Sequence, residues 1–206
     1  LCWKRIDCGG MSVASGKREK QTDRGLYEWV QAVVCSVLAI VLMFTFVVRI
    51  IGVSGQSMRE TLQNGDKLLV LNSCLCGDYR RGDIVIFQKP EFENGELIVK
   101  RVIATEGQTV DIDFAAGQVF VDGEALEEPY IREPTWLDEG LEFPITVPDG
   151  CVFVMGDNRN DSTDSRYEGL GPLDTRHIVG RAVLLVLPGE TADLDRREWS
   201  RIGTLN

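Results

Sequence analysis

The sequence predicts a mostly β protein: a single N-terminal transmembrane helix followed by an antiparallel, barrel-like β-sheet domain with a small inserted β subdomain. Two observations lead to this fold class. A run of 20 residues without a charge, from Trp29 to Val48, lies near the N-terminus. After Gly52 the apolar residues occur instead in short runs rich in Val, Ile, Leu and Phe, separated by Gly, Asp, Asn and Pro.

The uncharged run is long enough to cross a bilayer as a helix. Twenty residues at about 1.5 Å each span about 30 Å, the thickness of the hydrocarbon core. We expect this helix over residues 29–51, with Tyr27 and Trp29 at the membrane interface. A buried core helix and a cleaved signal peptide are the alternatives. The signal peptide is disfavoured because no Ala-x-Ala site follows the run.

The uneven charge of the chain predicts its topology. Residues 1–28 carry six basic and four acidic side chains, and the remaining chain carries 16 and 28, for a net charge of −10. Because basic flanks stay in the cytoplasm, we expect residues 1–28 to be a disordered cytoplasmic segment and the acidic body to be extracytoplasmic. The residues before Met11, a candidate start, should be disordered. An acidic body is not expected to bind nucleic acid.

The body is expected to form one domain over residues 52–190, followed by a tail, residues 191–206, in which a short helix can form. Acidic loops cluster in residues 111–147, which indicates an inserted subdomain. The alternating runs predict strands at residues 66–72, 82–88, 97–104, 109–114, 118–123, 151–156 and 180–188.

The cysteines and the single histidine do not form a metal-binding pattern. Cys74, Cys76 and Cys151 lie in the predicted extracytoplasmic domain, and three thiols cannot all pair with one another. The sequence leaves open whether Cys74 or Cys76 pairs with Cys151. The "CLC" spacing and His177 do not provide a zinc ligand set, so we expect neither a metal nor a cofactor.

The segment "SGQSMRETL", residues 54–62, contains a candidate nucleophile, Ser57. Gly55 permits unusual backbone angles, and Met58 can anchor the turn by burial. The pattern is not the nucleophile elbow G-x-S-x-G, since Arg59 stands at the second glycine position. A serine attacks only when a base takes its proton, and an ordinary turn serine is the alternative reading.

The candidate base is Lys100, in the run "LIVKRVIA". Alternation places Ile98 and Val102 on the same face, and burial among them would lower the pKa of the amine. A neutral amine can act as a general base. The alternative is a lysine whose stem packs while its head reaches water. His177 lies in a polar segment typical of a surface histidine.

The third stretch, "MGDNRNDSTDSRYEG", follows a predicted strand and is dense in Asp, Arg and Ser. A solvated polar loop is the default interpretation. The same density also suits a buried set of ion pairs that fixes neighbouring groups. The stretch becomes informative only together with Ser57 and Lys100.

Together these stretches resemble the bacterial type I signal peptidases, the membrane-bound leader peptidases. The serine box S-M-x-P-T-L of that family is matched by "SMRETL", and its lysine box K-R-V-I-G-x-x-G by "KRVIATEG". Its box G-D-N-R-x-x-S-x-D-S-R is matched in full by "GDNRNDSTDSR", and "RGDIVIF", "VFVDGEALEEPYI" and "GPLDTRHIVGRA" are also similar to family segments. The resemblance extends from about residue 25 to residue 190 in the expected order.

The resemblance implies roles for individual residues. Ser57 would be the nucleophile, with its own backbone N–H binding the oxyanion, and Lys100 would be the base, supported by Ser162. Val53, Met58 and Val99 would line the substrate pocket. The structural ion pairs of the family would fall on Asp157, Arg159, Asp164 and Arg166.

The chain departs from the family pattern at four positions. Gly55 lacks the side-chain oxyanion donor of some members, which indicates the Gram-positive-like branch. Glu60 replaces the usual proline, Ala104 a glycine and Gln108 an aspartate. None of these changes removes a catalytic group, so we expect them to affect geometry and rate only.

The resemblance therefore implies a membrane-anchored serine endopeptidase that removes signal peptides from exported preproteins through an acyl-enzyme. Its partners would be signal-peptide-bearing preproteins, the lipid bilayer of the bacterial cell membrane and, indirectly, a Sec-type export machinery. Two alternatives stay open: a self-cleaving repressor-type peptidase with the same Ser–Lys pair, and a catalytically inert β module at the cell surface. The uncharged span and the acidic body disfavour the repressor type.

Overall fold

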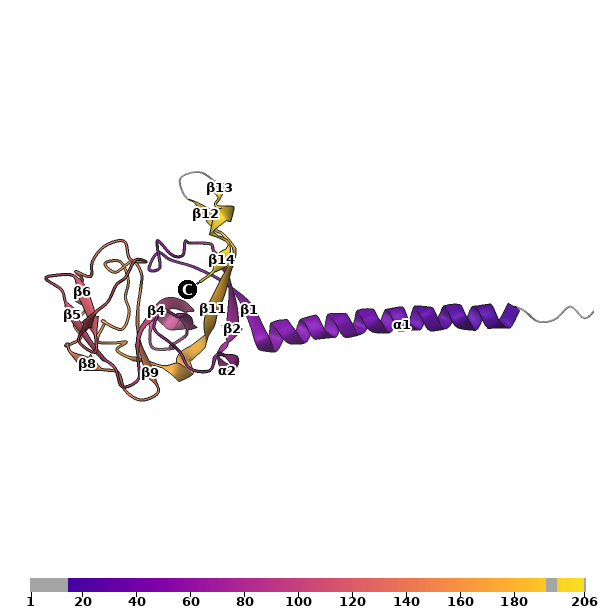
Figure 1. The fold of residues 1–206 in the computed structure, drawn as a ribbon, viewed down its shortest axis with the longest axis horizontal. Coiled ribbons are helices and arrows are strands. Elements are labelled where there is room, and N and C mark those ends of the chain that lie inside the picture. Colours follow the sequence, from indigo (N-terminus) through magenta and orange to yellow (C-terminus); the bar gives the residue numbers. More distant parts are fainter. Residues whose placement is uncertain (1–14, 192–195, 206) are drawn as a thin grey trace, which may run out of the picture. The chain divides into compact units, whose positions relative to one another are not determined.

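A computed structural model of the chain describes residues 15–191 and 196–205. The described chain divides into two compact units, the first ending at Phe44 and the second beginning at Thr45. Figure 1 shows a long helix in the first unit and a mostly β second unit. The candidate functional residues all belong to the second unit.

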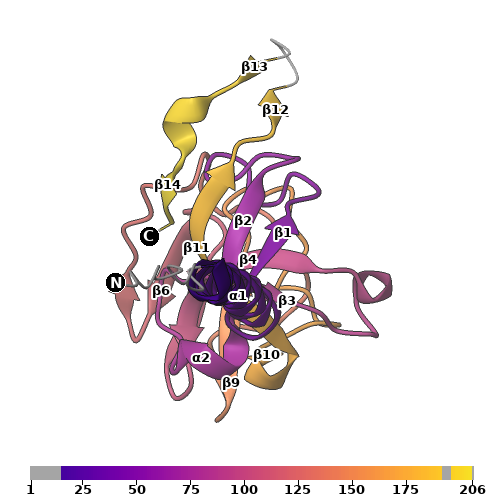
Figure 2. The same ribbon diagram turned by 90° about the vertical axis from the view of Figure 1, so that its right-hand side faces the viewer.

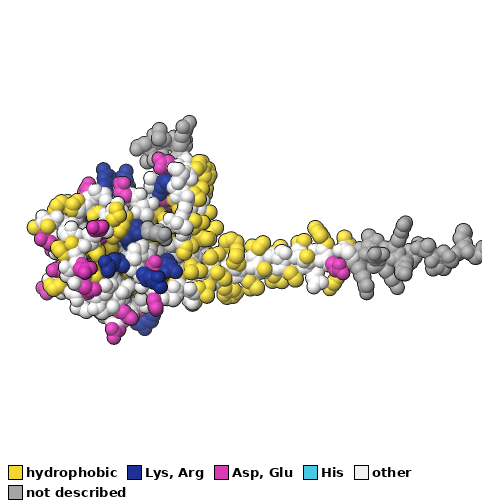
Figure 3. All heavy atoms as spheres, in the orientation of Figure 1, with side chains coloured by type: hydrophobic (Ala, Val, Ile, Leu, Met, Phe, Trp, Pro, Cys, Tyr) yellow, Lys and Arg dark blue, Asp and Glu magenta, His cyan; other side chains and the backbone are white. Residues whose placement is uncertain are grey.

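The first unit contains the helix α1 (Ser15–Leu42), and the boundary between the units falls within the short π-helical turn η1 (Met43–Val47) that follows it. Residues Gly25–Val47 form a helical span of 23 residues that is apolar and long enough to cross a membrane, and none of it is buried. Figure 3 shows apolar side chains along this helix.

Both predicted ends of the helix are corrected by the structure. Helix α1 begins at Ser15, within the segment that we expected to be disordered, because Lys, Arg, Glu and Gln there are good helix formers. Residues 1–14, the rest of the segment that we expected to be disordered, lie outside the described part of the chain. Helical geometry stops at Val47 rather than at residue 51, and the strand β1 (Val48–Gly52) follows. Its β-branched residues favour a strand, and Ile51 becomes buried there.

The second unit is built on an eight-stranded sheet with the order β1-β2-β11-β3-β4-β9-β10, and β14 pairs with β11. Every pair is antiparallel, as predicted. Figure 2 shows β11 beside β2, and its other pairing partner in the sheet order is β3. Register shifts in the pairing of β11 with β2 and of β4 with β9 mark bulges, which bend a sheet. The strands other than β1 are β2 (Lys67–Asn72), β3 (Ile84–Phe87), β4 (Ile98–Thr105), β9 (Cys151–Met155), β10 (Leu173–Asp174), β11 (Ile178–Leu187) and β14 (Gly203–Thr204).

A second sheet, with the order β7-β6-β5-β8, occupies the segment in which we expected a subdomain. Its apolar side chains pack against Phe153 and Met155 of β9. The strands are β5 (Thr109–Asp113), β6 (Gln118–Val121), β7 (Glu124–Ala125) and β8 (Ile145–Thr146).

The described part of the tail differs from the short helix that we expected. It contains the two-stranded pair β12 (Glu190–Thr191) and β13 (Arg196–Arg197), the single 3-10 turn η4 (Trp199–Arg201), and then β14. The edge of β11 is the physical reason, since it offers backbone partners to residues 203 and 204. The remaining short helices are α2 (Ser73–Cys76), η2 (Glu93–Gly95) and η3 (Thr175–His177).

Two features of the core bear on the site. Met58 and Leu62, from the loop between β1 and β2, are buried in one cluster with residues of β1, β2, β4 and β11. The loop that carries Ser57 is therefore packed on the sheet. Cys74, Cys76 and Cys151 are free thiols in the structure.

Candidate active site

Ser57 lies in the loop formed by residues 53–66, which the backbone closes at its base. Val53 donates to the Asp66 carbonyl at 2.8 Å, and Gly65 donates to the Val53 carbonyl at 2.9 Å. Immediately after the serine, the Leu62 N–H donates to the Met58 carbonyl at 2.8 Å and forms a helical turn. These bonds and the burial of Met58 fix the backbone on both sides of Ser57.

Gly156 brings this loop against the polar loop that follows β9. A side chain at Gly156 would place its Cβ 2.2 Å from Ser162 Oγ and 2.5 Å from the Ser57 carbonyl oxygen, so only glycine fits. The Asn158 N–H donates to the same Ser57 carbonyl at 3.0 Å. The two polar sequence motifs therefore meet around one glycine.

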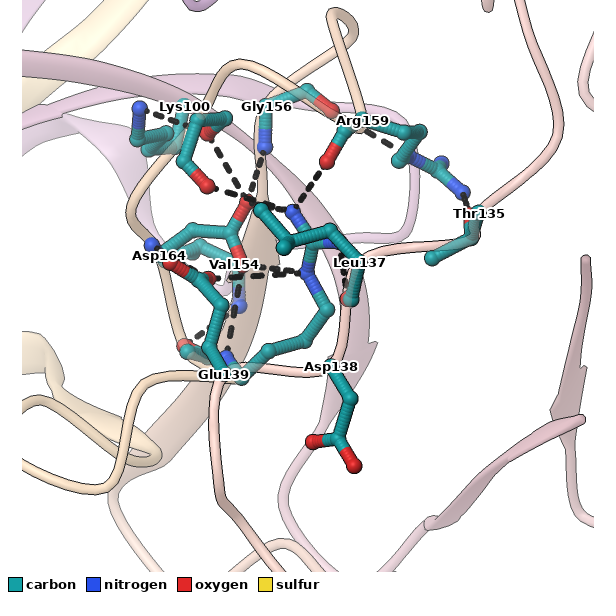
Figure 4. A network of polar contacts seen from close by, with 12 residues as sticks. Lys100, Thr135, Leu137, Asp138, Glu139, Val154, Gly156, Arg159 and Asp164 are labelled. Carbon is teal, nitrogen blue, oxygen red and sulfur yellow. Dashed lines mark hydrogen bonds and ion pairs between the residues drawn. The ribbon is translucent and has the colours of Figure 1, made fainter. Parts of the chain in front are cut away.

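Lys100 projects from β4 into the polar loop after β9 and is only 3% exposed. Its Nζ donates to Ser162 Oγ at 2.9 Å, and Ser162 Oγ donates to Asp164 Oδ2 at 2.9 Å. Figure 4 shows Lys100 and Asp164 as parts of this network. The amine is thus held in place by a neutral hydroxyl instead of a direct carboxylate partner.

Burial lowers the pKa of Lys100 from its usual 10.5 to about 8, and the negative charges of Asp164 and Glu139 oppose this shift. The direction is the one expected from the apolar neighbours of Lys100 in the sequence. The effect of the Asp164 charge on Lys100 is partly offset by Arg166, which donates to both carboxylate oxygens of Asp164 at 2.9 Å. Burial alone would raise the pKa of Asp164, but this bidentate contact holds it below its usual range.

The predicted ion pairs form, but two of them use partners outside the loop. Arg101 of β4 pairs with Asp157, its Nη2 lying 2.7 Å from Oδ2. Arg159 pairs with Glu128, from the connection between β7 and β8. Only Asp164 and Arg166 pair within the loop, as the sequence suggested. The loop is therefore tied both to the sheet and to the inserted segment.

Sequence reasoning missed Arg101, Glu128 and Glu139. Arg101 carried a signal, since it follows Lys100 directly in the lysine box. Glu139 had none, because it lies in an irregular acidic segment. It accepts the Asp164 N–H at 3.3 Å, and Figure 4 shows it beside Asp164. Burial and then the charge of Asp164 raise the pKa of Glu139 to about 7.

A groove of about 510 Å³ brings the predicted residues together. Ser57, Lys100 and Ser162 line it, with Val53, Met58 and Val99 as apolar wall residues. His177, the other base considered, is not among the lining residues; it lies in η3, where its carbonyl accepts from Gln88. A hydroxyl and a desolvated amine that share one groove can carry out acyl transfer.

No group of three or more His, Cys, Asp or Glu side chains within the described residues is arranged to hold a metal ion. Lys100, Ser162 and Asp164 are joined to one another by hydrogen bonds, and the carboxylates of Asp157 and Asp164 pair with arginine. This chemistry is that of a proton-transfer site.

The chain is similar to known proteins over most of its length. The family model described as "Signal peptidase, peptidase S26" matches residues 26–187. The signal peptidase I of Bacillus licheniformis is 35% identical over 180 residues, which are 82% of this chain and 94% of that protein. A probable signal peptidase I-1 of Synechocystis is 38% identical over 178 residues, 83% of each chain.

A crystal structure of a signal peptidase I from Enterococcus faecalis is 30% identical in sequence and aligns with a TM-score of 0.41, covering 50% of this chain and 96% of that one. The family model includes the segments that carry Ser57, Lys100 and Ser162. The chain therefore belongs to the S26 family of signal peptidases, serine peptidases that cleave signal peptides.

Proposed function

We propose that the chain cleaves signal peptides with Ser57 as the nucleophile and Lys100 as its general base. The observation that carries this assignment is the state of Lys100. It is buried, its pKa is lowered to about 8, and it lines the same groove as Ser57. A lysine with an ordinary pKa would be an ammonium at neutral pH and could not accept a proton.

The reaction would take place in two acyl transfers. Neutral Lys100 accepts the proton of the Ser57 hydroxyl while Oγ attacks the scissile carbonyl carbon, and the Ser57 N–H donates to the developing oxyanion. Lys100 then returns the proton to the leaving amine, and the mature protein departs with a new N-terminus. A water molecule that gives its proton to Lys100 then attacks the ester carbonyl carbon. Lys100 returns this proton to Ser57 Oγ as the bond to Oγ breaks and the signal peptide leaves with a free carboxylate. Ser162 orients Nζ throughout by its 2.9 Å hydrogen bond.

The groove fits the substrate class. Val53, Met58 and Val99 provide apolar walls, which suit the small side chains expected before the cleavage site. The substrate is a preprotein whose signal peptide lies in the membrane, and the span Gly25–Val47 would hold the enzyme at the same surface. Shared tethering raises the effective concentration of the scissile bond. Contact with a Sec-type export machinery would be indirect.

Ser57→Ala should abolish cleavage of a membrane-inserted preprotein, because no hydroxyl remains to be acylated. The side chain is only partly buried, so the variant should keep the fold and the melting temperature of the wild type. Cleavage is measured by mapping the new N-terminus. Ser73→Ala, in α2 away from the groove, is the control and should retain activity. Robust cleavage by Ser57→Ala would exclude this serine as the nucleophile.

The pH dependence follows from the pKa of Lys100. Only the neutral amine accepts a proton, so kcat/KM should rise with pH and level off above about 8. Lys100→Arg should be inactive across this range, because the guanidinium stays protonated. The measurement is kcat/KM on a signal-peptide substrate between about pH 6 and pH 10. A flat profile, or an active Lys100→Arg variant, would remove Lys100 as the base.

Ser162→Ala removes a hydrogen-bond partner of Lys100 but leaves the base itself. We expect transition-state stabilisation to fall by about 1.5 kcal/mol, roughly tenfold in kcat. Ser165→Ala is a matched control from the same loop, since Ser165 Oγ accepts the Val154 N–H and makes no contact with Lys100. That variant should lose thermal stability more than activity. A loss in Ser162→Ala as deep as in Lys100→Ala would contradict a supporting role.

The proposed localisation is the bacterial cell membrane, with a single pass, a cytoplasmic N-terminus and an extracytoplasmic catalytic unit. The basic N-terminal flank and the acidic body support this orientation. Protease added to intact cells without an outer membrane should digest the unit that begins at Thr45 and spare a tag at the N-terminus. Protection of the catalytic unit in intact cells, with digestion after lysis, would reverse the orientation.

A further inference from the structure

The C-terminal segment beyond the family match is docked on the catalytic unit. The family model ends at residue 187, the last residue of β11. The segment Trp199–Leu205 nevertheless returns to the sheet, where β14 pairs with β11 and the Leu205 N–H donates to the Val183 carbonyl at 3.3 Å. Leu205 packs against the cluster that contains Met58 and Leu62. A segment outside the matched region therefore touches the support of the serine loop.

Arg201 makes the polar contacts of this segment with the serine loop. Its Nη1 donates to Asp66 Oδ1 at 3.1 Å, and its Nη2 donates to Asp66 Oδ2 at 2.7 Å. Nη2 also donates to the Thr61 carbonyl at 3.2 Å. The arginine side chain is 15% exposed and the Asp66 side chain is fully buried. The pair is consequently desolvated, which makes it strong and makes its loss costly.

Asp66 closes the loop of residues 53–66, to which Arg201 is hydrogen-bonded. Its carboxylate accepts the N–H groups of Gln63 at 2.8 Å and Gly189 at 2.7 Å, in addition to the two bonds from Arg201. Its carbonyl accepts the Val53 N–H at the base of the same loop. The arginine thus supplies the positive charge for the carboxylate that organises the end of the loop.

Thr61, in the turn that follows Ser57, is held both through its side chain and through its backbone carbonyl. On the side of the active site, its Oγ1 donates to Asp157 Oδ2 at 2.5 Å and accepts from Arg101 Nη2 at 3.3 Å. On the other side, Arg201 holds its carbonyl. The residue before it, Glu60, has a φ of +93°, which L-amino acids with side chains rarely adopt. Such a conformation persists where the surroundings over-determine it.

From these contacts we infer that Arg201 is a positioning residue: it holds the turn after Ser57 so that the serine hydroxyl stays in the groove beside Lys100. The inference rests on the proposed roles of Ser57 and Lys100. Arg201 acts through Thr61 and Asp66 and does not touch the substrate.

The test is kcat and KM of the purified full chain on a membrane-inserted preprotein. Arg201→Ala should lower kcat about tenfold with KM changed less than about twofold, because the loss is in nucleophile placement. Arg201→Lys should recover part of the rate, since it keeps the charge opposite Asp66. The rate at which a serine-reactive acylating probe labels Ser57 should fall in parallel with kcat.

Arg181→Ala is the matched control. It breaks the ion pair between Arg181 and Asp83, whose side chains are 25% and 20% exposed and whose Nη1–Oδ2 distance is 3.0 Å. This pair joins β11 to the residue before β3 and does not contact the serine loop. A comparable loss of thermal stability without the loss of kcat is expected. Equal losses of kcat in both variants would reduce Arg201 to general stabilisation and overturn the inference.

A second measurement separates positioning from stability. Glu60→Gly lets the turn adopt its positive φ without steric cost, so the loss of kcat caused by Arg201→Ala should be smaller in that background. Independent, multiplicative losses would contradict the inference.

If Arg201→Ala does not fold, Arg201→Gln replaces it, and wild-type kcat and labelling rate in that variant would overturn the inference. Ser57→Ala in the same assay tests the proposed function separately, because its activity would remove the nucleophile whatever Arg201 does.

Discussion

The desolvation of Lys100 is the constraint on which the rest of the site depends. Burial favours the neutral form of an amine and so lowers its pKa, but a buried amine also needs a hydrogen-bond partner. A carboxylate at that place would stabilise the ammonium and return the pKa toward its usual value. Ser162 resolves this conflict, because its hydroxyl accepts a hydrogen bond from Nζ and donates one to Asp164. The acid is kept one hydroxyl away from the base.

The buried carboxylate of Asp164 in turn requires a charge partner, and a chain of ion pairs and hydrogen bonds extends from it through the second unit. Asp164 is itself fully buried, so Arg166 must pair with it, and Arg166 is in turn held by the backbone carbonyls of Leu137 and Arg159. Arg159 is neutralised by Glu128. The inserted segment therefore contributes to the electrostatic balance of the base as well as to the core. Glu139 and Lys100 also influence each other, because the negative charge of Glu139 raises the pKa of Lys100 and the positive charge of Lys100 lowers that of Glu139.

Much of the fold and part of the site could be predicted from the sequence, for reasons of distance along the chain. The strands were predictable because their alternation is local, and the contact of Asp164 with Arg166 because two positions separate them. Arg101 and Asp157 are separated by 56 residues, and Arg201 and Asp66 by 135 residues. No local sequence pattern predicts contacts at such separations.

The end of the membrane helix was unpredictable for a different reason. Residues 48–52 continue the apolar run with Val48, Ile50 and Ile51 around Arg49, and their pairing with β2 decides their conformation. Composition alone does not separate an apolar strand from the last turn of an apolar helix. The partner strand lies beyond the next loop, out of reach of any short sequence window.

The conformation of Glu60 limits how this protein can change. The resembling family usually has proline at this position, yet a proline ring fixes φ near −65° and cannot adopt +93°. A proline at position 60 would therefore not fit this turn as it stands, and exchanging the side chain alone would force the backbone to change. A design that copies the proline of the family motif to this position would therefore destabilise the turn that follows Ser57.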